Sequence, residues 1–411
     1  MSFRTAISGL RAASSELSVI GNNVANANTT GFKASRAQFA DVFAATNGTS
    51  SSSATGGGVN TARIAQQFTQ GNITFTDNGL DLAISGKGFF VLDDNGAQVY
   101  SRDGAFGIDR NGFVVNSSGQ TVKAYQPDSS GAITGAVDKL RITSTNAAPS
   151  ATTLVNLGAN LDSQEAAPAL AFDPAVNASF NSTTATTVYD SLGGSHLMQL
   201  YFVKSDDAAA TWDIYARLDG APSTFAAPNA SISFDNAGVL NTSETGTPNG
   251  QLALAFTGLP SGAADLAVTL DINEMTQFGA PFGVNRVTQD GFTTGRLTSL
   301  DIDALGNVMA HYSNGQTKIQ GQVALANFAN EQGLRSVGGN SWTETPESGA
   351  VVLGNPASGD LGSLQSGALE DSNIDLSEQL VKLIVAQRNF QANTQVIQTE
   401  EATNQAIINI R

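Results

Sequence analysis

The chain has 411 residues, 41% of them hydrophobic, which is enough for more than one buried core, so we expect two or three domains. Its formal net charge is -16 with only 20 Lys and Arg, which excludes nucleic acid as an expected partner because a phosphate backbone needs a basic surface. The absence of cysteine excludes disulfides and thiolate metal sites, and no apolar run is long enough for membrane insertion.

The first predicted element is a helix within residues 1–30, part of a terminal helical domain. Its apolar residues recur at alternate steps of four and three, if Ser14 and Gly21 count as small members of the series. This heptad spacing is typical of a helix that packs against another helix. The apolar members of the series are Phe3, Ile7, Leu10, Leu17 and Val24.

The same helix is expected to end in an asparagine-rich stretch, IGNNVANANTTGFK. Asparagine tolerates left-handed backbone and can bond the carbonyls that a helix end exposes. Gly31 supplies a freely positive φ, and Phe32 can anchor the exit. An ordinary helix C-cap would use Gly31 and one asparagine, so the stretch predicts a turn that contacts something more. The asparagines concerned are Asn22, Asn23, Asn26 and Asn28.

Between the ends the pattern favours β structure. Residues 31–70 and 361–369 are predicted as extended linker, with low-complexity Ser, Thr and Gly at 45–60. The turn signals DDNG, DRNG and SNG divide short β-rich runs into hairpins, which predicts an inner β domain at 71–145 and 285–360.

An inserted outer β domain is predicted at 146–284. This segment holds thirteen acidic residues against two basic ones, which indicates a solvated, separately folded domain.

The patterns of catalytic and metal sites are not met. The stretch DIDALGNVMAHY has Leu305 and Tyr312 where a calcium loop needs oxygen ligands, so we expect a hairpin turn there. His196 and His311, the only histidines, are expected as two half-exposed strand residues. We predict that the protein is not an enzyme, with no catalytic residue, no cofactor and no bound metal.

The last predicted element is a long helix in residues 370–411, the second part of the terminal helical domain. Asp375 followed by Glu378 has the spacing of a capping box, and neither proline nor glycine follows before Arg411. A helix of this length with a polar-interrupted seam needs partners, so we expect the two ends to pair with each other and with other copies. The apolar seam residues are Leu376, Leu380, Leu383, Phe390, Ile397 and Ile408.

Four glutamines of this helix are neighbours at steps of four, four and three. They form either an ordinary solvated face or an uncharged polar lining of a channel, and both interpretations stay open. The glutamines are Gln387, Gln391, Gln395 and Gln398.

Both ends of the chain resemble the rod and hook family of axial proteins of the bacterial flagellum. The stretches SGLRAASSELSVIGNNVANANTTGFKASRAQF and LEDSNIDLSEQLVKLIVAQRNFQANTQVIQT carry that resemblance. NGLDLAISGKGFFVL and DGFTTGRLTSLDIDALGNVMAHYSNGQ are similar to the inner domain of its hook members. The fold class expected is therefore mainly β with paired long α-helical termini, as a nested multidomain axial protein with a terminal coiled-coil domain.

The resemblance implies a structural subunit of the flagellar hook. Many copies would form a hollow curved helical tube that is a universal joint between rod and filament and part of the export channel. The terminal helices and the asparagine turn would be the subunit-assembly residues.

Further partners implied are the distal rod protein, the hook cap protein, the hook-filament junction protein and the flagellar type III export apparatus. The expected location is the hook, extracellular, reached without a cleaved signal peptide.

Two alternatives stay open at this point. The distal rod protein of the basal body shares both terminal signatures, but it is shorter and lacks a large inserted domain. A secreted glycan-binding adhesin would use aromatic residues of the outer domain as a sugar platform, although strand alternation favours core packing for them. These aromatic residues are Tyr189, Tyr201, Phe202, Trp212 and Tyr215.

Overall fold

The structure is a computed structural model that describes residues 3–42, 56–128, 131–143, 146–206, 210–222, 230–242, 248–259 and 262–409. The chain divides into two compact units. The terminal unit comprises Met1–Ser144, Ser299–His311 and Thr317–Arg411, and the inserted unit comprises Thr145–Thr298 and Tyr312–Gln316. Most of the low-complexity stretch predicted as linker, residues 45–55, lies outside the described residues.

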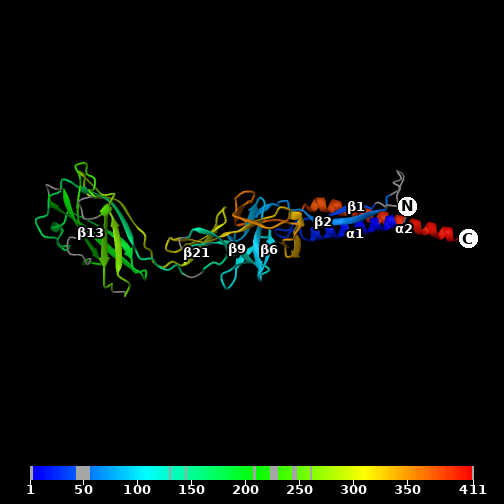
Figure 1. Ribbon diagram of the computed structural model, residues 1–411, viewed down its shortest axis with the longest axis horizontal. Helices are drawn as coiled ribbons and strands as arrows, with labels where there is room; N and C mark the ends of the chain where they lie inside the picture. Colours follow the sequence, from blue (N-terminus) through cyan, green and yellow to red (C-terminus); the bar gives the residue numbers. More distant parts are fainter. Residues whose placement is uncertain are drawn as a thin grey trace. The chain divides into compact units, whose positions relative to one another are not determined.

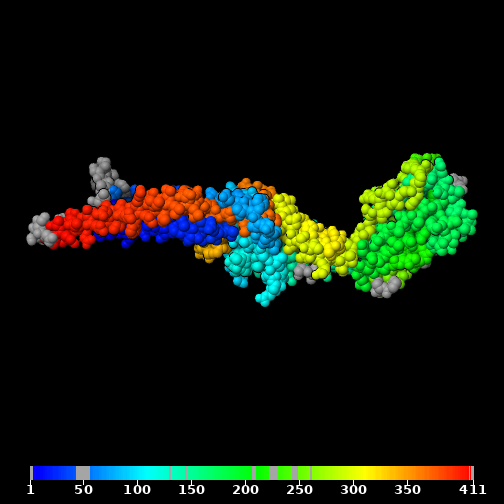
Figure 2. Space-filling view, turned by 180° about the vertical axis from the view of Figure 1, so that it is seen from behind, coloured from blue at the N-terminus to red at the C-terminus, as the bar shows by residue number. Residues whose placement is uncertain are grey.

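A helix stands near each end of the chain, as predicted. Helix α1 spans Phe3–Ala25 and helix α2 spans Leu376–Asn409. The two lie side by side in the terminal unit and run in opposite directions, so that both chain ends are at the same end of the pair (Figures 1 and 2).

Helix α2 begins where the sequence predicts. The Oδ1 atom of Asp375 accepts hydrogen bonds from the backbone N–H groups of Ser377 at 2.8 Å and Glu378 at 3.2 Å. Glu378 itself forms an ion pair with Lys382 one turn further on, at 2.7 Å. Asp375 is therefore the N-cap residue of a helix of 34 residues.

The strands between the helices in the terminal unit are short and largely antiparallel. Hairpin β1–β2 (Ser35–Asp41 and Val59–Gln66) packs on α1, and two further pairs join β3 (Ile73–Phe75) to β29 (Ala368–Glu370) and β4 (Leu82–Ser85) to β28 (Ser363–Ser366). The large sheet contains, in chain order, β5 (Phe89–Asp94), β6 (Ala97–Ser101), β7 (Phe106–Ile108), β8 (Val114–Asn116), β9 (Thr121–Pro127), β10 (Ile133–Lys139), β21 (Leu297–Ile302), β22 (Asn307–Tyr312), β23 (Thr317–Val323), β24 (Leu325–Asn327), β25 (Arg335–Gly338), β26 (Ser341–Thr343) and β27 (Val352–Gly354).

The predicted hairpin turns lie where these strands reverse. The DDNG turn joins β5 to β6, and both Asn95 (φ 52°) and Gly96 (φ 96°) have the positive φ that a tight two-residue hairpin loop requires. The SNG turn joins β22 to β23. Aromatic rings fill the core beneath, where Phe89 packs edge-on against Phe68, Phe328 and Trp342.

The inserted unit contains two five-stranded sheets that share one core. The first holds β11 (Leu154–Asp162), β17 (Gln251–Phe256), β18 (Leu266–Asp271), β19 (Thr276–Phe278) and β20 (Gly283–Gln289). The second holds β12 (Ser182–Tyr189), β13 (Ser195–Asp206), β14 (Thr211–Leu218), β15 (Ala221–Pro222) and β16 (Ala230–Ser233). Both sheets alternate buried and outward-facing residues, and their buried faces form a single apolar cluster.

Some of the aromatic residues considered as a sugar platform belong to this core, and others do not. Phe202 and Trp212 are fully buried in it, which confirms core packing for these two. Tyr201 is also buried, and the Phe172 ring packs edge-on against it and stacks on Tyr215.

The expectation for His196 was wrong. It is a buried side chain of β13 whose ring nitrogens both face carboxylates, with Nδ1 at 2.6 Å from Asp219 and Nε2 at 3.1 Å from Asp190. Burial by itself lowers the pKa of the His196 imidazole, but the two carboxylates outweigh burial and raise it. His311 is half-buried on β22 and within 3.0 Å of the Thr317 hydroxyl, as expected of a strand histidine.

The raised pKa makes the stability of the inserted unit depend on pH. The unfolded chain protonates this histidine near 6.5, so its stabilising contribution is full below that pH and is lost as pH rises through the higher folded-state pKa. We expect NMR titration to place the His196 midpoint above 6.5 and Asp219→Asn to lower it. A midpoint that Asp219→Asn leaves unchanged would contradict the role of this contact.

Candidate assembly site

Small residues of α1 lie in its contact with α2, and the buried Ile20 shares their face of the helix. Ala6 and Ala13 are buried, and a Cβ atom added to Gly9 would lie 2.5 Å from the Asn393 side chain of α2. Near the other end of α1, the Asn23 amide donates to Gln379 at 3.3 Å. In each of these pairs, Gly9 with Asn393 and Asn23 with Gln379, the two residue numbers add up to 402. The helices are therefore antiparallel, and residue i of α1 lies opposite residue 402 − i of α2.

The first three large apolar residues predicted for assembly on α1, Phe3, Ile7 and Leu10, lie to the side of this contact, on average about 110° from Gly9 and Ala13 at 3.6 residues per turn. Leu17 and Val24 lie closer to it, about 60° and 40° away. These five residues are half-buried to exposed, and Phe3 is 48% exposed.

The residues of the predicted apolar seam of α2 differ in exposure: some face α1 and others are exposed. Leu383, Phe390 and Ile397 are half-buried and alternate with buried or half-buried Gln379, Ala386 and Asn393 on the side toward α1. Leu376, Leu380 and Ile408 are 45%, 51% and 71% exposed within the single chain. The four glutamines are also exposed, about 125° around α2 from the side that contacts α1. These glutamines are Gln387, Gln391, Gln395 and Gln398.

In the asparagine stretch at the end of α1, Asn23 is buried, and both its side-chain oxygen and its side-chain nitrogen form hydrogen bonds. Its Oδ1 accepts from the Ser35 backbone N–H at 2.9 Å and its Nδ2 donates to the Ser35 carbonyl at 2.8 Å. The side-chain amide therefore pairs with Ser35 as a neighbouring strand would, and ties the end of α1 to the start of β1. Asn22 is exposed, whereas Asn26 donates through Nδ2 to the Asn22 carbonyl at 2.9 Å and so caps the helix end.

Gly31 and its neighbours connect this turn to the β part of the terminal unit. Gly31 has φ 65°, its N–H donates to the Glu370 carbonyl at 2.7 Å, and a Cβ there would lie 2.5 Å from the Asp103 nitrogen. A side chain is excluded by both the backbone conformation and the close approach. Phe32 is half-buried, and the Thr30 hydroxyl donates to Asp103 at 3.0 Å, where burial raises the pKa of the Asp103 carboxyl.

A buried ion cluster centred on Glu370 lies at the same place. One carboxylate oxygen accepts from Lys33 Nζ at 2.6 Å and from the Gly71 N–H at 2.8 Å, and the other accepts from Arg102 at 3.0 Å. The side chains of Lys33 and Glu370 are fully buried, and that of Arg102 is 3% exposed. Burial lowers the pKa of the Lys33 ammonium, and the Glu370 carboxylate opposes that shift.

This cluster fastens four separate passes of the chain. Lys33 follows α1, Gly71 follows β2, Arg102 belongs to the β core, and Glu370 precedes α2. Asn373 adds a second link, because it accepts from the Ala34 N–H at 2.8 Å and donates to the Gln67 carbonyl at 2.7 Å. The junction between the helices and the β part is therefore a cross-linked polar core.

No prediction from the sequence concerns Lys33, Arg102 or Glu370. Their signal is weak: Lys33 stands between a phenylalanine and an alanine in GFKA, and Glu370 is one of two adjacent acids in ALED, on the short segments that connect the helices to the strands. Only the fold shows that residues 337 positions apart in the chain are partners.

Neither a metal site nor a membrane-spanning helix appears in the part of the chain that the structure describes. In these residues no three His, Asp or Glu side chains gather as metal ligands. Neither α1 nor α2, over its described length, is apolar enough to cross a membrane.

Family models cover most of this architecture. Residues 3–33 match the flagella basal body rod protein, 83–154 the flagellar hook protein FlgE/F/G D1 domain, 160–292 the flagellar basal body protein FlaE D2 domain, and 365–410 the flagellar basal body rod FlgEFG protein C-terminal region. A helix at each end of a mainly β chain, with these matches, defines an axial protein of the flagellum.

Full-length relatives define the family more closely. The chain is 40% identical over 422 residues to flagellar hook protein FlgE of Escherichia coli (strain K12), with 100% of both chains covered. It is 34% identical to FlgE of Rhizobium meliloti (strain 1021), covering 99% of this chain and 98% of that one. The chain therefore belongs to the flagellar hook protein FlgE family, whose members are structural proteins.

The fold is also similar to the crystal structure of Helicobacter pylori flagellar hook protein FlgE2. The TM-score is 0.54 at 16% identity, and the likeness covers 72% of this chain and 100% of that chain.

The Glu370 cluster predicts a sharp response to loss of one charge. Glu370→Gln leaves Lys33 and Arg102 buried without their counter-ion, which costs about 3–5 kcal/mol. We expect thermal unfolding of the purified chain to show a clearly less stable terminal unit. Asp371→Asn is the matched control, because it removes the same charge from the next residue, where Thr74 is the exposed partner. Equal melting temperatures for the two variants would contradict the account.

Proposed function

We propose that this chain polymerises into a hollow, curved helical tube, the flagellar hook, which transmits torque from the rod to the filament as a universal joint and forms part of the export channel. The observation that carries the proposal is the incomplete covering of the two helices. The β1–β2 hairpin contacts one face of α1 and α2 contacts another, but Phe3 and Leu10 face neither, and Ile7 lines an open pocket beside the hairpin. On α2, Leu380, Val381 and Ile384 are at least half exposed.

Such faces need a partner. A 34-residue helix gains most of its stability in water from packing, and contiguous exposed apolar residues mark an interaction surface. Further copies of the same chain supply that surface in a tube. The heptad spacing of both seams favours coiled-coil packing for this contact. This supports the assembly role predicted for the terminal helices, and we propose the same role for the asparagine turn.

The nested arrangement proposed follows the chain. Residues 1–30 and 370–411 form the tube interior around the channel, 31–70 and 361–369 connect them to an inner β domain at 71–145 and 285–360, and the acidic domain at 146–284 lies outermost. Lateral helix packing would resist twisting. Polar surfaces of the outer domains would slide past one another as the tube bends.

The proposal includes further partners and a location. Copies at the ends of the tube would contact the distal rod protein, the hook cap protein and the hook-filament junction protein. The chain would reach its extracellular position through the flagellar type III export apparatus, without a cleaved signal peptide. It would perform no catalysis and need no cofactor.

Electron cryotomography of flagellar motors in a strain of the source organism that lacks this gene tests the proposal. We expect rods that end at the cell surface without a curved tube, and hooks restored by the wild-type gene. Truncated rods would point to a rod protein instead. Intact hooks in the deletion strain would overturn the assignment.

The exposed glutamine row is proposed as channel lining. Uncharged polar side chains give an unfolded cargo chain few sites to adhere to. Replacing Gln391 and Gln395 by leucine adds apolar contacts of about 1 kcal/mol each, and we expect filament growth to slow about fivefold or more. The same residues changed to asparagine keep the amides and form the control. Normal growth of the leucine variant, measured by filament length over time, would leave the solvated-face interpretation.

A further inference from the structure

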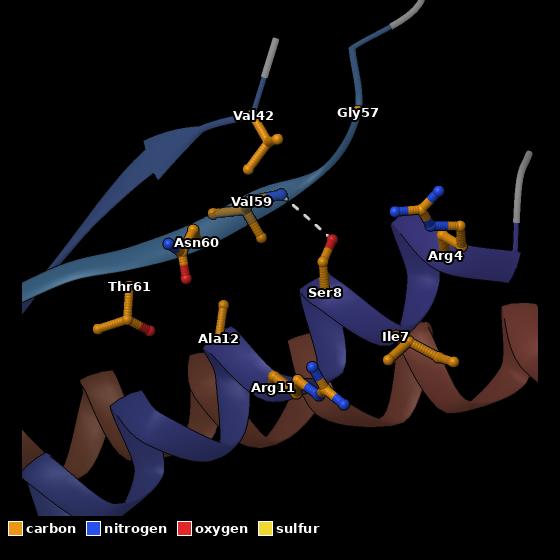
Figure 3. A pocket seen from close by; sticks show the side chains of 10 residues that line it. All are labelled: Arg4, Ile7, Ser8, Arg11, Ala12, Val42, Gly57, Val59, Asn60 and Thr61. Carbon is orange, nitrogen blue, oxygen red and sulfur yellow. Dashed lines mark hydrogen bonds between the residues drawn. The ribbon is translucent and has the colours of Figure 1, made fainter. Parts of the chain in front are cut away.

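An open pocket of about 420 Å³ lies between α1 and the β1–β2 hairpin. Figure 3 shows it with Ile7 and Ala12 of α1 and Val59 of β2 among its apolar lining. The Val59 N–H donates to the Ser8 hydroxyl at 3.1 Å, and a Cβ at Gly58 would lie 2.3 Å from that oxygen. The helix and the hairpin are thus held together at one side of the pocket.

Two arginines of α1, Arg4 and Arg11, line the same pocket (Figure 3). They are seven residues apart, two turns along one face of the helix, and both are exposed. Arg4 stands in the first turn of α1, where the helix dipole disfavours a positive charge. A cation at an unfavourable helix position is stabilised when an anionic partner lies beside it.

The chain itself does not supply that partner within its described part. Among the described residues, neither arginine forms an ion pair. Residues 43–55, which connect the two strands of the hairpin, include no acidic residue in the sequence. Asp41, at the end of β1, is exposed and lies opposite Val59 in the hairpin, but among the described residues it forms no ion pair with either arginine.

Two acidic residues of α2 lack an ion-pair partner among the described residues, as the two arginines do. Glu400 is half-buried and Glu401 is exposed, and in the described part of the chain neither has an ion-pair partner. The other exposed acids of α2 and its cap are engaged, because Glu378 pairs with Lys382 and Asp375 caps the helix.

The charges of the two ends are complementary as a whole. Residues 1–70 hold five basic and two acidic residues, a net +3 in a chain of -16. Residues 370–411 hold six acidic and three basic residues, a net -3.

The α2 helix of the same chain lies on the wrong side of α1 to fill the pocket. At 100° per residue, Arg4 and Arg11 point about 170° from Gly9 and Ala13, the residues nearest to α2. Figure 3 shows the hairpin on one side of α1 and α2 on another.

We propose that the pocket between α1 and the β1–β2 hairpin binds the Glu400–Glu401 segment of α2 from a second copy of this chain. The carboxylates pair with Arg4 and Arg11, and the apolar lining receives the neighbouring apolar residues of that helix. The inference rests on the proposed function, and it names one contact by which successive copies join.

Charge reversal on the two sides tests this contact. One variant carries Arg4→Glu and Arg11→Glu, the other carries Glu400→Lys and Glu401→Lys, and each is expressed in the deletion strain alone or together. Alone, each places like charges against each other, and we expect at least about tenfold fewer hooks per cell by electron microscopy. When both variants are present, the acidic pocket of the first can bind the basic helix of the second, and the basic pocket of the second can bind the acidic helix of the first. We therefore expect alternating copies to restore the hooks.

The controls separate the possible failures. Arg36→Glu and Asp360→Lys change single exposed charges of the terminal unit away from the pocket, and both should assemble normally. If the wild-type gene does not restore hooks, the proposed function fails. If wild type assembles and the reversed variants also assemble alone, or do not rescue each other, the inference is overturned.

A cross-link test does not depend on charge reversal. Because the chain has no cysteine, Arg11→Cys in one tagged chain and Glu401→Cys in another introduce the only thiols. We expect oxidation of the mixed polymer to give a disulfide dimer of tagged and untagged chains, whereas Arg36→Cys with Glu401→Cys gives none. Absence of the mixed dimer in assembled tubes would overturn the inference.

Discussion

The buried carboxylate of Glu370 is the interaction on which the terminal unit depends. It holds an ammonium, a guanidinium and a backbone N–H that come from three other passes of the chain. A buried ion cluster contributes little net stability over an apolar core, but it is costly to break and it specifies one arrangement. Here that arrangement fixes where α1 ends, where α2 begins, and how both attach to the β sheet.

This junction gives the helices a defined relation to the strands while leaving much of their surface uncovered. Around α1, one face contacts the β1–β2 hairpin, one contacts α2 through residues that include Gly9 and Ala13, and a third carries Phe3 and Leu10 outward. The small residues allow close helix packing within one chain. Large apolar residues such as Phe3 remain exposed for contacts with other chains, as expected of a subunit of a polymer.

Much of the fold was predictable because its signals are local. The cap at Asp375 and the Asn95–Gly96 turn follow from the preferences of a few adjacent residues, and the confirmed class, mainly β with a helix at each end, follows from them. The heptad pattern, in contrast, indicated Phe3, Ile7, Leu10, Leu17 and Val24, and the structure shows that alanine and glycine are part of the contact within the chain. His196 and Glu370 were beyond prediction, because their environments depend on partners that the fold brings together, the latter from 337 positions away.

Cryo-electron microscopy of the curved tube formed by this chain would test the central claim most directly, namely that the helical end and its Glu370 junction form one rigid element. Copies on the inner and outer side of the bend would be compared. The account predicts that the geometry from α1 through Lys33 and Glu370 to α2 is the same in every copy, while the spacing between neighbouring inserted units changes around the circumference. A junction that itself changes conformation between the two sides would contradict it.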